Sequence, residues 1–396
     1  MSKSILVLGR QPELGIAELE SLYGPESITE ISPNIVSLSL DPRDIDFERL
    51  GGSVKLAKYL TDIDSTKWSE IFQYLNSTIP KHLDHLPEGK LKLGMSVYNL
   101  NASANDINRT LLGLKKTIKA SGRSVRVIPN KAQTLNSAQV LYNQLTNQLG
   151  WELLLIRDGN KTILAQTVRE QDIDAYAARD QNRPKRDSKV GMLPPKLAQI
   201  IINLADRGQK NEGYTKKTVL DPFCGTGVVL QESLLIGYSA YGTDIEPRMI
   251  DYSKANLEWV SDKIKGGTNY QLEVKDAMQD KWDKPFDIVA CETYLGRPLA
   301  TEPDSDTLNK IIQDCNFIHK KFLTNILGQI ESDTLMSIAV PVWKIKGQNI
   351  HLPILDHLEE IGYTELSFVH TKGSKLIYRR EDQIVGREII ILTKSK

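Results

Sequence analysis

The spacing of hydrophobic and polar positions changes about halfway along the chain. From about residue 191 onward, short apolar runs alternate with segments whose apolar residues recur every three or four positions. The runs predict strands at 217–220, 240–244, 269–274 and 287–290, and the segment 228–236 predicts a helix that ends at Gly237. Strands that alternate with helices are typical of a doubly wound α/β sheet. Two further apolar segments, 369–376 and 387–393, predict an antiparallel pair that closes this sheet.

The first 170 residues show a mixed order of strands and helices. A hairpin is predicted where two alternating segments flank Asp158-Gly159-Asn160, which has turn-forming composition. The other predicted strands are 4–8, 35–40, 91–100 and 124–128, and the predicted helices are 15–23, 68–75 and 110–120. This order favours an α+β region, joined by a connection at 171–190 to the α/β part.

One loop of the α/β part carries a ligand-binding signature, Asp221-Pro222-Phe223-Cys224-Gly225-Thr226-Gly227. Two glycines between a strand and a helix let a ligand approach the backbone, and the helix N-terminus favours polar or anionic groups. A dinucleotide-binding loop would need a third glycine where this chain has Leu230. A glycine-rich turn without a ligand remains the alternative.

Acidic residues follow the next three predicted strands. They are Asp244, Asp276 and Glu292. Each alone could be a solvated surface residue. Because ligands of open α/β sheets bind beyond the carboxyl ends of the strands, the series predicts that these residues converge on one crevice with Asp221.

Composition excludes several classes of protein. The chain has 396 residues, of which 40% are hydrophobic and 25% charged, and no apolar run approaches the roughly twenty residues of a membrane span. Its three cysteines lack metal-binding spacing, which predicts a reducing cytoplasm and no metal site. The formal net charge is zero, so binding to nucleic acid would need local basic patches.

Two such patches are present. Arg179, Arg183, Lys185 and Arg186 lie within the predicted connection, where a run of charges could also be a solvated linker. A second cluster, which includes Lys115, Lys116 and Lys119, follows the polar face of the predicted helix 110–120. Both patches suit the phosphates of a structured RNA.

The quoted motifs resemble a known family, the class I RNA methyltransferases that carry a THUMP domain. The loop 221–227 is similar to their first motif, and the opening Leu8-Gly9-Arg10-Gln11-Pro12-Glu13-Leu14 and the segment 191–198 are similar to theirs. Within that family, the chain is most similar to the archaeal and eukaryotic tRNA guanosine-N2-methyltransferases that act at position ten. The resemblance implies a ferredoxin-like part at 1–60, a THUMP-like domain at 61–170, a linker at 171–190 and a Rossmann-like methyltransferase domain at 191–396.

The resemblance also implies a set of partners and residue roles. S-adenosylmethionine would bind through Asp221, Phe223, Gly225, Gly227, Asp244 and Asp276, with Asp244 on the ribose and Asp276 on the adenine. Glu292 and Tyr294 would hold the target base, and Arg179, Arg183, Lys185 and Arg186 would contact tRNA. We expect a cytoplasmic, monomeric enzyme without a metal.

One motif departs from the family pattern. The family carries Asp-Pro-Pro-Tyr-Gly after the fourth strand, and this chain has Glu292-Thr293-Tyr294-Leu295-Gly296. Glu292 keeps a carboxylate acceptor and Tyr294 keeps an aromatic ring, whereas Thr293 predicts a looser turn than proline would form. The alternatives are an RNA-binding protein with an inactive or redirected site, and a DNA amino-methyltransferase, which the N-terminal region disfavours.

Overall fold

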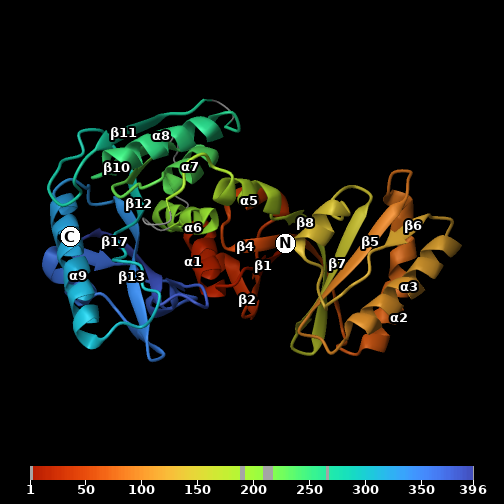
Figure 1. Cartoon of the computed structure of the whole chain (residues 1–396). Helices are drawn as coiled ribbons and strands as arrows, with labels where there is room; N and C mark the ends of the chain where they lie inside the picture. The colour runs from red at the N-terminus through yellow and green to blue at the C-terminus, as the bar shows by residue number, and fades with distance from the viewer. Residues whose placement is uncertain (1–2, 188–191, 208–216, 265–266, 396) are drawn as a thin grey trace. The chain divides into compact units, whose positions relative to one another are not determined.

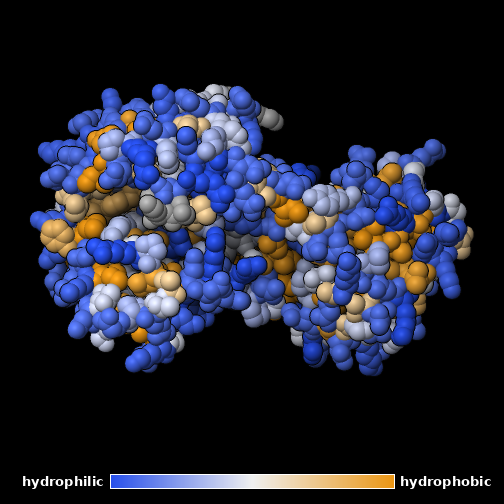
Figure 2. All heavy atoms as spheres, in the orientation of Figure 1, coloured by the Kyte–Doolittle hydropathy of each residue, from blue (hydrophilic) through white to orange (hydrophobic). Residues whose placement is uncertain are grey.

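The computed structural model describes residues 3–187, 192–207, 217–264 and 267–395. The chain divides into two compact units (Figure 1). Unit 1 comprises Met1–Gly9, Ser27–Glu48 and Ser53–Ala175, and unit 2 comprises Arg10–Glu26, Arg49–Gly52 and Tyr176–Lys396. The predicted boundaries at residues 60 and 170 stay a prediction, and the boundary at 190 lies outside the described residues. On the face seen in Figure 2, hydrophilic residues predominate over both units.

Unit 1 is built on an eight-stranded mixed sheet of order β2-β3-β1-β4-β8-β7-β5-β6. Its strands are β1 (Ser4–Leu8), β2 (Ile28–Ser32), β3 (Ile35–Leu38), β4 (Ser53–Ile63), β5 (Leu91–Tyr98), β6 (Val125–Val127), β7 (Gly150–Asp158) and β8 (Lys161–Glu170). Its helices are α2 (Trp68–Thr78), α3 (Ala104–Ala120) and α4 (Ser137–Tyr142). The predicted hairpin is confirmed as the antiparallel pair β7–β8, with Asp158 opposite Lys161.

Unit 2 contains a second sheet, whose main path is β11-β10-β9-β12-β13-β17-β15. Its strands are β9 (Thr218–Asp221), β10 (Ser239–Asp244), β11 (Tyr270–Val274), β12 (Ile288–Glu292), β13 (Leu335–Ile345), β14 (Gln348–Ile350), β15 (Tyr363–Glu365), β16 (Ile377–Tyr378) and β17 (Val385–Lys394). The first five strands of the path run parallel, and β17 lies antiparallel to β13. The predicted α/β sheet with an antiparallel closing strand is therefore confirmed.

The closing pair itself was predicted with the wrong partner. Residues 369–376 do not form a strand, and β17 pairs instead with β13, β15 and β16. The amides of Val369 and His370 donate to the side-chain oxygens of Glu20 at 2.6 and 2.9 Å. Because these donors are already used, they are not available to a strand ladder.

Helices cover both faces of this sheet. They are α6 (Pro195–Asp206), α7 (Val228–Leu235), α8 (Pro247–Ser261), α9 (Ser305–Leu327) and α10 (Leu358–Ile361), and α1 (Pro12–Tyr23) packs on α6. Helix α5 (Ile173–Gln181) begins in unit 1 and ends in unit 2. Successive strand residues point to opposite faces. Val219 and Ile288 therefore pack in one core with α6, whereas Leu220 and Val289 pack in another with α9.

Helix α1 belongs to unit 2 although it precedes most of unit 1 in sequence. Its Leu14 and Ala17 share a core with residues of α6. Asn203 of α6 is fully buried, and its amide donates to Glu18 at 2.7 Å and to the Arg49 carbonyl at 2.9 Å, while its Oδ1 accepts from Arg49. One side chain therefore bonds to both segments of unit 2 that come from the first 52 residues.

We expect Asn203→Ala to lower the free energy of unfolding of unit 2 by about 3 kcal/mol, because the Arg49 carbonyl and Nε lose their bonds to Asn203 and Glu18 keeps only the amides of Gly51 and Gly52 as donors. Urea denaturation of the full chain measures this loss. Asn101→Ala, at an exposed position of unit 1, is the matched control. Equal stability of the two variants would show that the Asn203 contacts do not hold α1 in place.

Candidate active site at the carboxyl ends of the parallel strands

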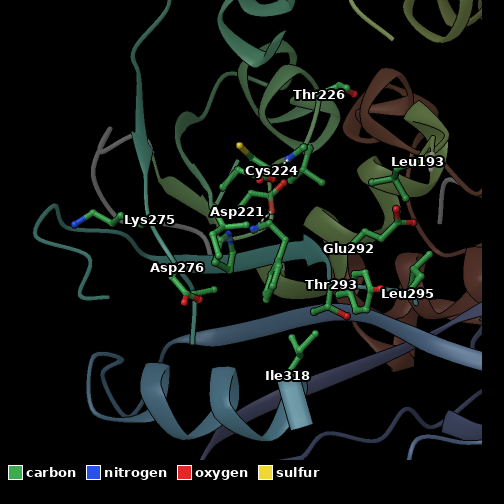
Figure 3. A pocket seen from close by; sticks show the side chains of 18 of the residues that line it. Leu193, Asp221, Cys224, Thr226, Lys275, Asp276, Glu292, Thr293, Leu295 and Ile318 are labelled. Carbon is green, nitrogen blue, oxygen red and sulfur yellow. Dashed lines mark hydrogen bonds between the residues drawn. The ribbon is translucent and has the colours of Figure 1, made fainter. Parts of the chain in front are cut away.

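The loop 221–227 lies at the point where the strand order of unit 2 reverses. Successive strands run outward on one side from β9 to β11 and on the other from β12 to β13. Crevices beyond such a reversal are the usual ligand sites of open α/β sheets. A cavity of about 440 Å³ opens there, lined by the loop and by the ends of β10, β11 and β12 (Figure 3).

Helix α8 fixes the glycine loop from behind. Gly225 and Gly227 adopt positive φ values of 51° and 80°. Ser253 donates to the Gly225 carbonyl at 2.8 Å, and Asn256 donates to the Thr226 carbonyl at 2.8 Å. A Cβ at Gly227 would lie 2.9 Å from Ser253 Oγ, so this glycine is required for the packing of the loop against α8.

Three carboxylates meet at this loop. Asp221 accepts a hydrogen bond from the Phe223 amide at 3.1 Å, and Asp244 accepts from the Gly225 amide at 2.9 Å. Burial raises the pKa of Asp221 well above its usual range, and the charges of Asp244 and Glu292 raise it further. Burial also raises the pKa of Asp244. A crevice that gathers acidic groups in this way favours a cationic ligand.

The remaining predicted cofactor residues also line the cavity. Phe223 packs edge-to-face on Phe322, with ring centroids 5.0 Å apart. Asp276 accepts from the Met278 amide at 2.9 Å and from Gln279 at 3.1 Å, so its carboxylate shapes the turn after β11. Ile245, which follows Asp244 and is 57% exposed, lines the cavity as well. Ile245 carries no motif that singles it out in the sequence, although it directly follows the acid at the end of β10.

The motif 292–296 forms the opposite wall of the cavity, and Figure 3 places Asp221 between Glu292 and Asp276. Glu292 ends β12 and pairs with the Arg387 guanidinium of β17 through Oε1, while Oε2 makes no hydrogen bond within the described chain. Tyr294 is 40% exposed beside it. One carboxylate oxygen and one aromatic ring thus remain available to a planar ligand. The expected looseness at Thr293 is not found, because this residue is buried and its hydroxyl is hydrogen-bonded.

Solved structures share this architecture over the whole chain. TrmN from Thermus thermophilus matches with a TM-score of 0.52 at 14% identity, covering 100% of both chains. SMU.472, a putative methyltransferase complexed with SAH, matches with a TM-score of 0.51 at 10% identity, covering 100% of this chain and 98% of that one. The strand order and these matches agree. The chain has the class I methyltransferase fold.

Curated relatives are similar over part of the chain. The tRNA (guanine(10)-N2)-dimethyltransferase of Methanocaldococcus jannaschii is 44% identical over 183 residues, which cover 44% of this chain and 49% of that protein. The protein of the same name from Pyrococcus abyssi is 28% identical over 196 residues, covering 48% of this chain and 50% of its own length. The chain therefore spans about half the length of the curated relatives it matches. No protein-family model matches the chain.

The four basic residues of the predicted linker differ in their exposure: Arg179 and Arg183 lie against the protein, and Lys185 and Arg186 face solvent. Arg179 donates to Glu232 of α7 at 2.7 Å, and Arg183 is 3% exposed, with no hydrogen-bond partner for its guanidinium among the described residues. Lys185 and Arg186 are exposed. Their contact with RNA stays a prediction. The ion pair of Arg179 is a long-range contact that the local sequence did not indicate.

The backbone of this segment is bonded to α8. Asn256 accepts from the Lys185 amide at 2.9 Å and donates to the Lys185 carbonyl at 2.9 Å. Asp187 pairs with Arg248 of α8 at 3.0 Å. The same Asn256 bonds to Thr226, so one side chain connects the basic segment with the glycine loop.

The described ranges contain neither a membrane-spanning helix nor a cluster of metal ligands. No helix there is long and apolar enough to span a membrane. The described residues also contain no cluster of three or more His, Cys, Asp or Glu side chains arranged to hold a metal ion.

We expect Arg179→Ala to destabilise the protein by about 3–5 kcal/mol near pH 8, because it leaves Glu232 buried without its cation. Burial already raises the pKa of Glu232 to about 7, and the loss of Arg179 raises it further. Since protonation removes the unpaired charge, the deficit should shrink towards pH 5. Chemical denaturation at both pH values measures the effect.

Arg186→Ala is the control for this experiment, since Arg186 is exposed and its contacts are at 3.4 Å or longer. Its stability should equal that of the parent. A variant Arg179→Ala as stable as Arg186→Ala at pH 8 would show that the ion pair contributes nothing.

Proposed function

We propose that the protein methylates tRNA with S-adenosylmethionine, at the exocyclic N2 of a guanosine. The convergence of Asp221, Asp244 and Glu292 on one cavity of a methyltransferase fold carries this proposal. The names of the curated relatives support the substrate, and the resemblance of the motifs supports the target atom.

The cofactor would occupy the cavity with its charged end at the glycine loop. Its ammonium and sulfonium are cations, and the buried carboxylate of Asp221 lies beside two further acids. Gly225 and Phe223 line the cavity where the methionine end would lie, whereas Gly227 faces Ser253 of α8 and supports the loop from behind. Asp244 would accept from the ribose hydroxyls and Asp276 from the adenine amine, with Ile245 against the adenine ring.

The target base would enter on the side of Glu292 and Tyr294. An exocyclic amine of guanine is a weak nucleophile, because its lone pair is delocalised into the ring. Oε2 of Glu292 would accept a hydrogen bond from the amine and turn its lone pair towards the methyl group of the cofactor, while Arg387 holds Oε1. As the N–C bond forms, the S–C bond of the sulfonium would break and the amine proton would leave, with Glu292 as its nearest acceptor. Tyr294 would stack on the base, and orientation then supplies most of the rate.

Transfer RNA would be held by basic residues outside the cavity. Lys185 and Arg186 are exposed on a segment bonded to α8, and Lys116 and Lys119 are exposed on α3 of unit 1. We assign phosphate contacts to these four residues. We also assign to unit 1 the role of an RNA-binding domain. Arg179 serves the protein itself through Glu232.

Affinity for S-adenosylmethionine should fall as the pH is lowered from 7.5 to 5. A cation binds better to the ionised form of Asp221, whose pKa in the free protein is raised, so binding releases a proton and strengthens as the pH rises. Each unit of pKa shift corresponds to about tenfold in affinity. Calorimetry in buffers of different ionisation enthalpy measures the released proton.

Asp221→Asn should flatten this pH dependence and weaken binding at pH 7.5. Asp251→Asn, at an exposed position of α8, is the matched control and should behave as the parent. If Asp221→Asn kept the parent's affinity and pH dependence, Asp221 would not face the charged end of the cofactor.

The direct test incubates the full chain with labelled S-adenosylmethionine and total tRNA, and identifies the modified nucleoside by mass spectrometry. Glu292→Ala should lower kcat by about 10²–10³-fold, and Glu292→Gln should keep part of the activity because its amide oxygen still accepts. Tyr294→Ala should cost about 1–3 kcal/mol of stacking, whereas Tyr294→Phe should be neutral.

Cofactor affinity should survive all four substitutions. Glu292→Ala with full activity would exclude an amine held by this side chain. A parent chain that binds cofactor and tRNA without methylating it would instead support the alternative that the altered motif 292–296 leaves open, an RNA-binding protein with an inactive or redirected site.

A further inference from the structure

The motif 292–296 lies along one face of helix α9. Gly296 has a φ of 85°, and a Cβ at this position would lie 3.1 Å from Cys315 Sγ and 3.2 Å from Ile311 Cγ2. Ile311, Cys315 and His319 recur at intervals of four residues and therefore share that face. The helix forms a rigid platform under the motif.

Thr293 is the residue of the motif that bonds to this platform. It is 4% exposed, and its Oγ1 lies 2.7 Å from His319 Nε2 and 2.9 Å from the Ala339 carbonyl oxygen. Its amide donates to the same carbonyl at 3.0 Å. The hydroxyl has one proton and two possible acceptors, so its direction has to be decided.

His319 decides that direction. The ring is 1% exposed, and its Nδ1 lies 2.6 Å from the Cys315 carbonyl, which can only accept, so Nδ1 carries the proton. Burial lowers the pKa of His319 to about 4, which leaves the ring neutral and Nε2 with a free lone pair at neutral pH. With Nδ1 protonated, Nε2 can only accept, and the Thr293 hydroxyl is the donor that faces it at 2.7 Å. The Ala339 carbonyl, which could also accept the hydroxyl proton at 2.9 Å, already receives the Thr293 amide. We therefore place the hydroxyl proton on the shorter contact, to Nε2.

We infer that Thr293 and His319 together are positioning residues for the target base, and replace the prolyl turn of the related motif. Thr293 stands between Glu292 and Tyr294, so its backbone conformation sets the angle between the acceptor oxygen and the stacking ring. Proline would restrict this conformation because its ring fixes φ. Here the hydrogen bond from Thr293 to the buried imidazole of His319 restricts it instead. The inference rests on the proposed function, because it concerns the orientation of that base.

The test compares Thr293→Ser, which keeps the hydroxyl, with Thr293→Val, which keeps the shape and removes it. In steady-state methylation of tRNA, Thr293→Val should lose about 10²-fold in kcat, as a misplacement of about 1 Å does, while Thr293→Ser stays near the parent. The Kd of S-adenosylmethionine by calorimetry and the KM for tRNA should change less than about twofold. This separation distinguishes positioning from general loss of structure.

His319→Leu should match Thr293→Val, and the double variant should be no worse than either single one, because the two side chains act as one unit. Thr324→Val is the matched control: its exposed hydroxyl on α9 donates to the Lys320 carbonyl at 2.8 Å, away from the motif. Should Thr293→Val not fold, Thr293→Ala takes its place.

The experiments distinguish a failure of the positioning role of Thr293 and His319 from a failure of the proposed methyltransferase function. If the parent methylates tRNA and a folded variant without the Thr293 hydroxyl keeps the parent's kcat, the inference is overturned. Additive losses in the double variant would also overturn it. If the parent itself transfers no methyl group to tRNA, the proposed function fails first, and that result is seen before any variant is measured.

Discussion

The crowding of carboxylates at the ends of the parallel strands is the constraint on which the site depends. Asp221, Asp244 and Glu292 would repel one another in a buried crevice, and the fold supplies a partner to each. Backbone amides of the glycine loop serve the two aspartates, and Arg387 serves Glu292. The glycine loop, which α8 supports through Ser253 and Asn256, and the antiparallel strand β17, which pairs with β13, therefore both contribute partners to the acids of the site.

Local pattern was sufficient to predict the strands of unit 2 and the acids that follow them, because a strand and its carboxyl end are adjacent in sequence. The same reasoning placed Asp221, Asp244 and Glu292 at one cavity, since parallel strands bring their carboxyl ends together. It failed where a partner lies far along the chain. The amides of residues 369 and 370 bind Glu20, and Thr293 bonds to His319, and nothing near either segment indicates these contacts.

The basic segment before the methyltransferase fold was treated as a linker, yet it is attached to both helices that flank the glycine loop. Arg179 binds α7 through Glu232, and the Lys185 backbone binds α8 through Asn256. Asn256 also bonds to Thr226. The basic segment and the glycine loop therefore share Asn256 as a hydrogen-bond partner.

Helix α1 is synthesised long before the helix on which it packs. It ends at Tyr23, and the helix on which it packs begins at Pro195, about 170 residues further along. At synthesis rates of about 5–20 residues per second, α6 would be synthesised roughly ten to thirty seconds after α1. The apolar residues of α1 would have no packing partner during that time. Unit 1 is complete in sequence at Ala175, shortly before α6 begins, whereas the sheet of unit 2 is complete only once β17 has been synthesised.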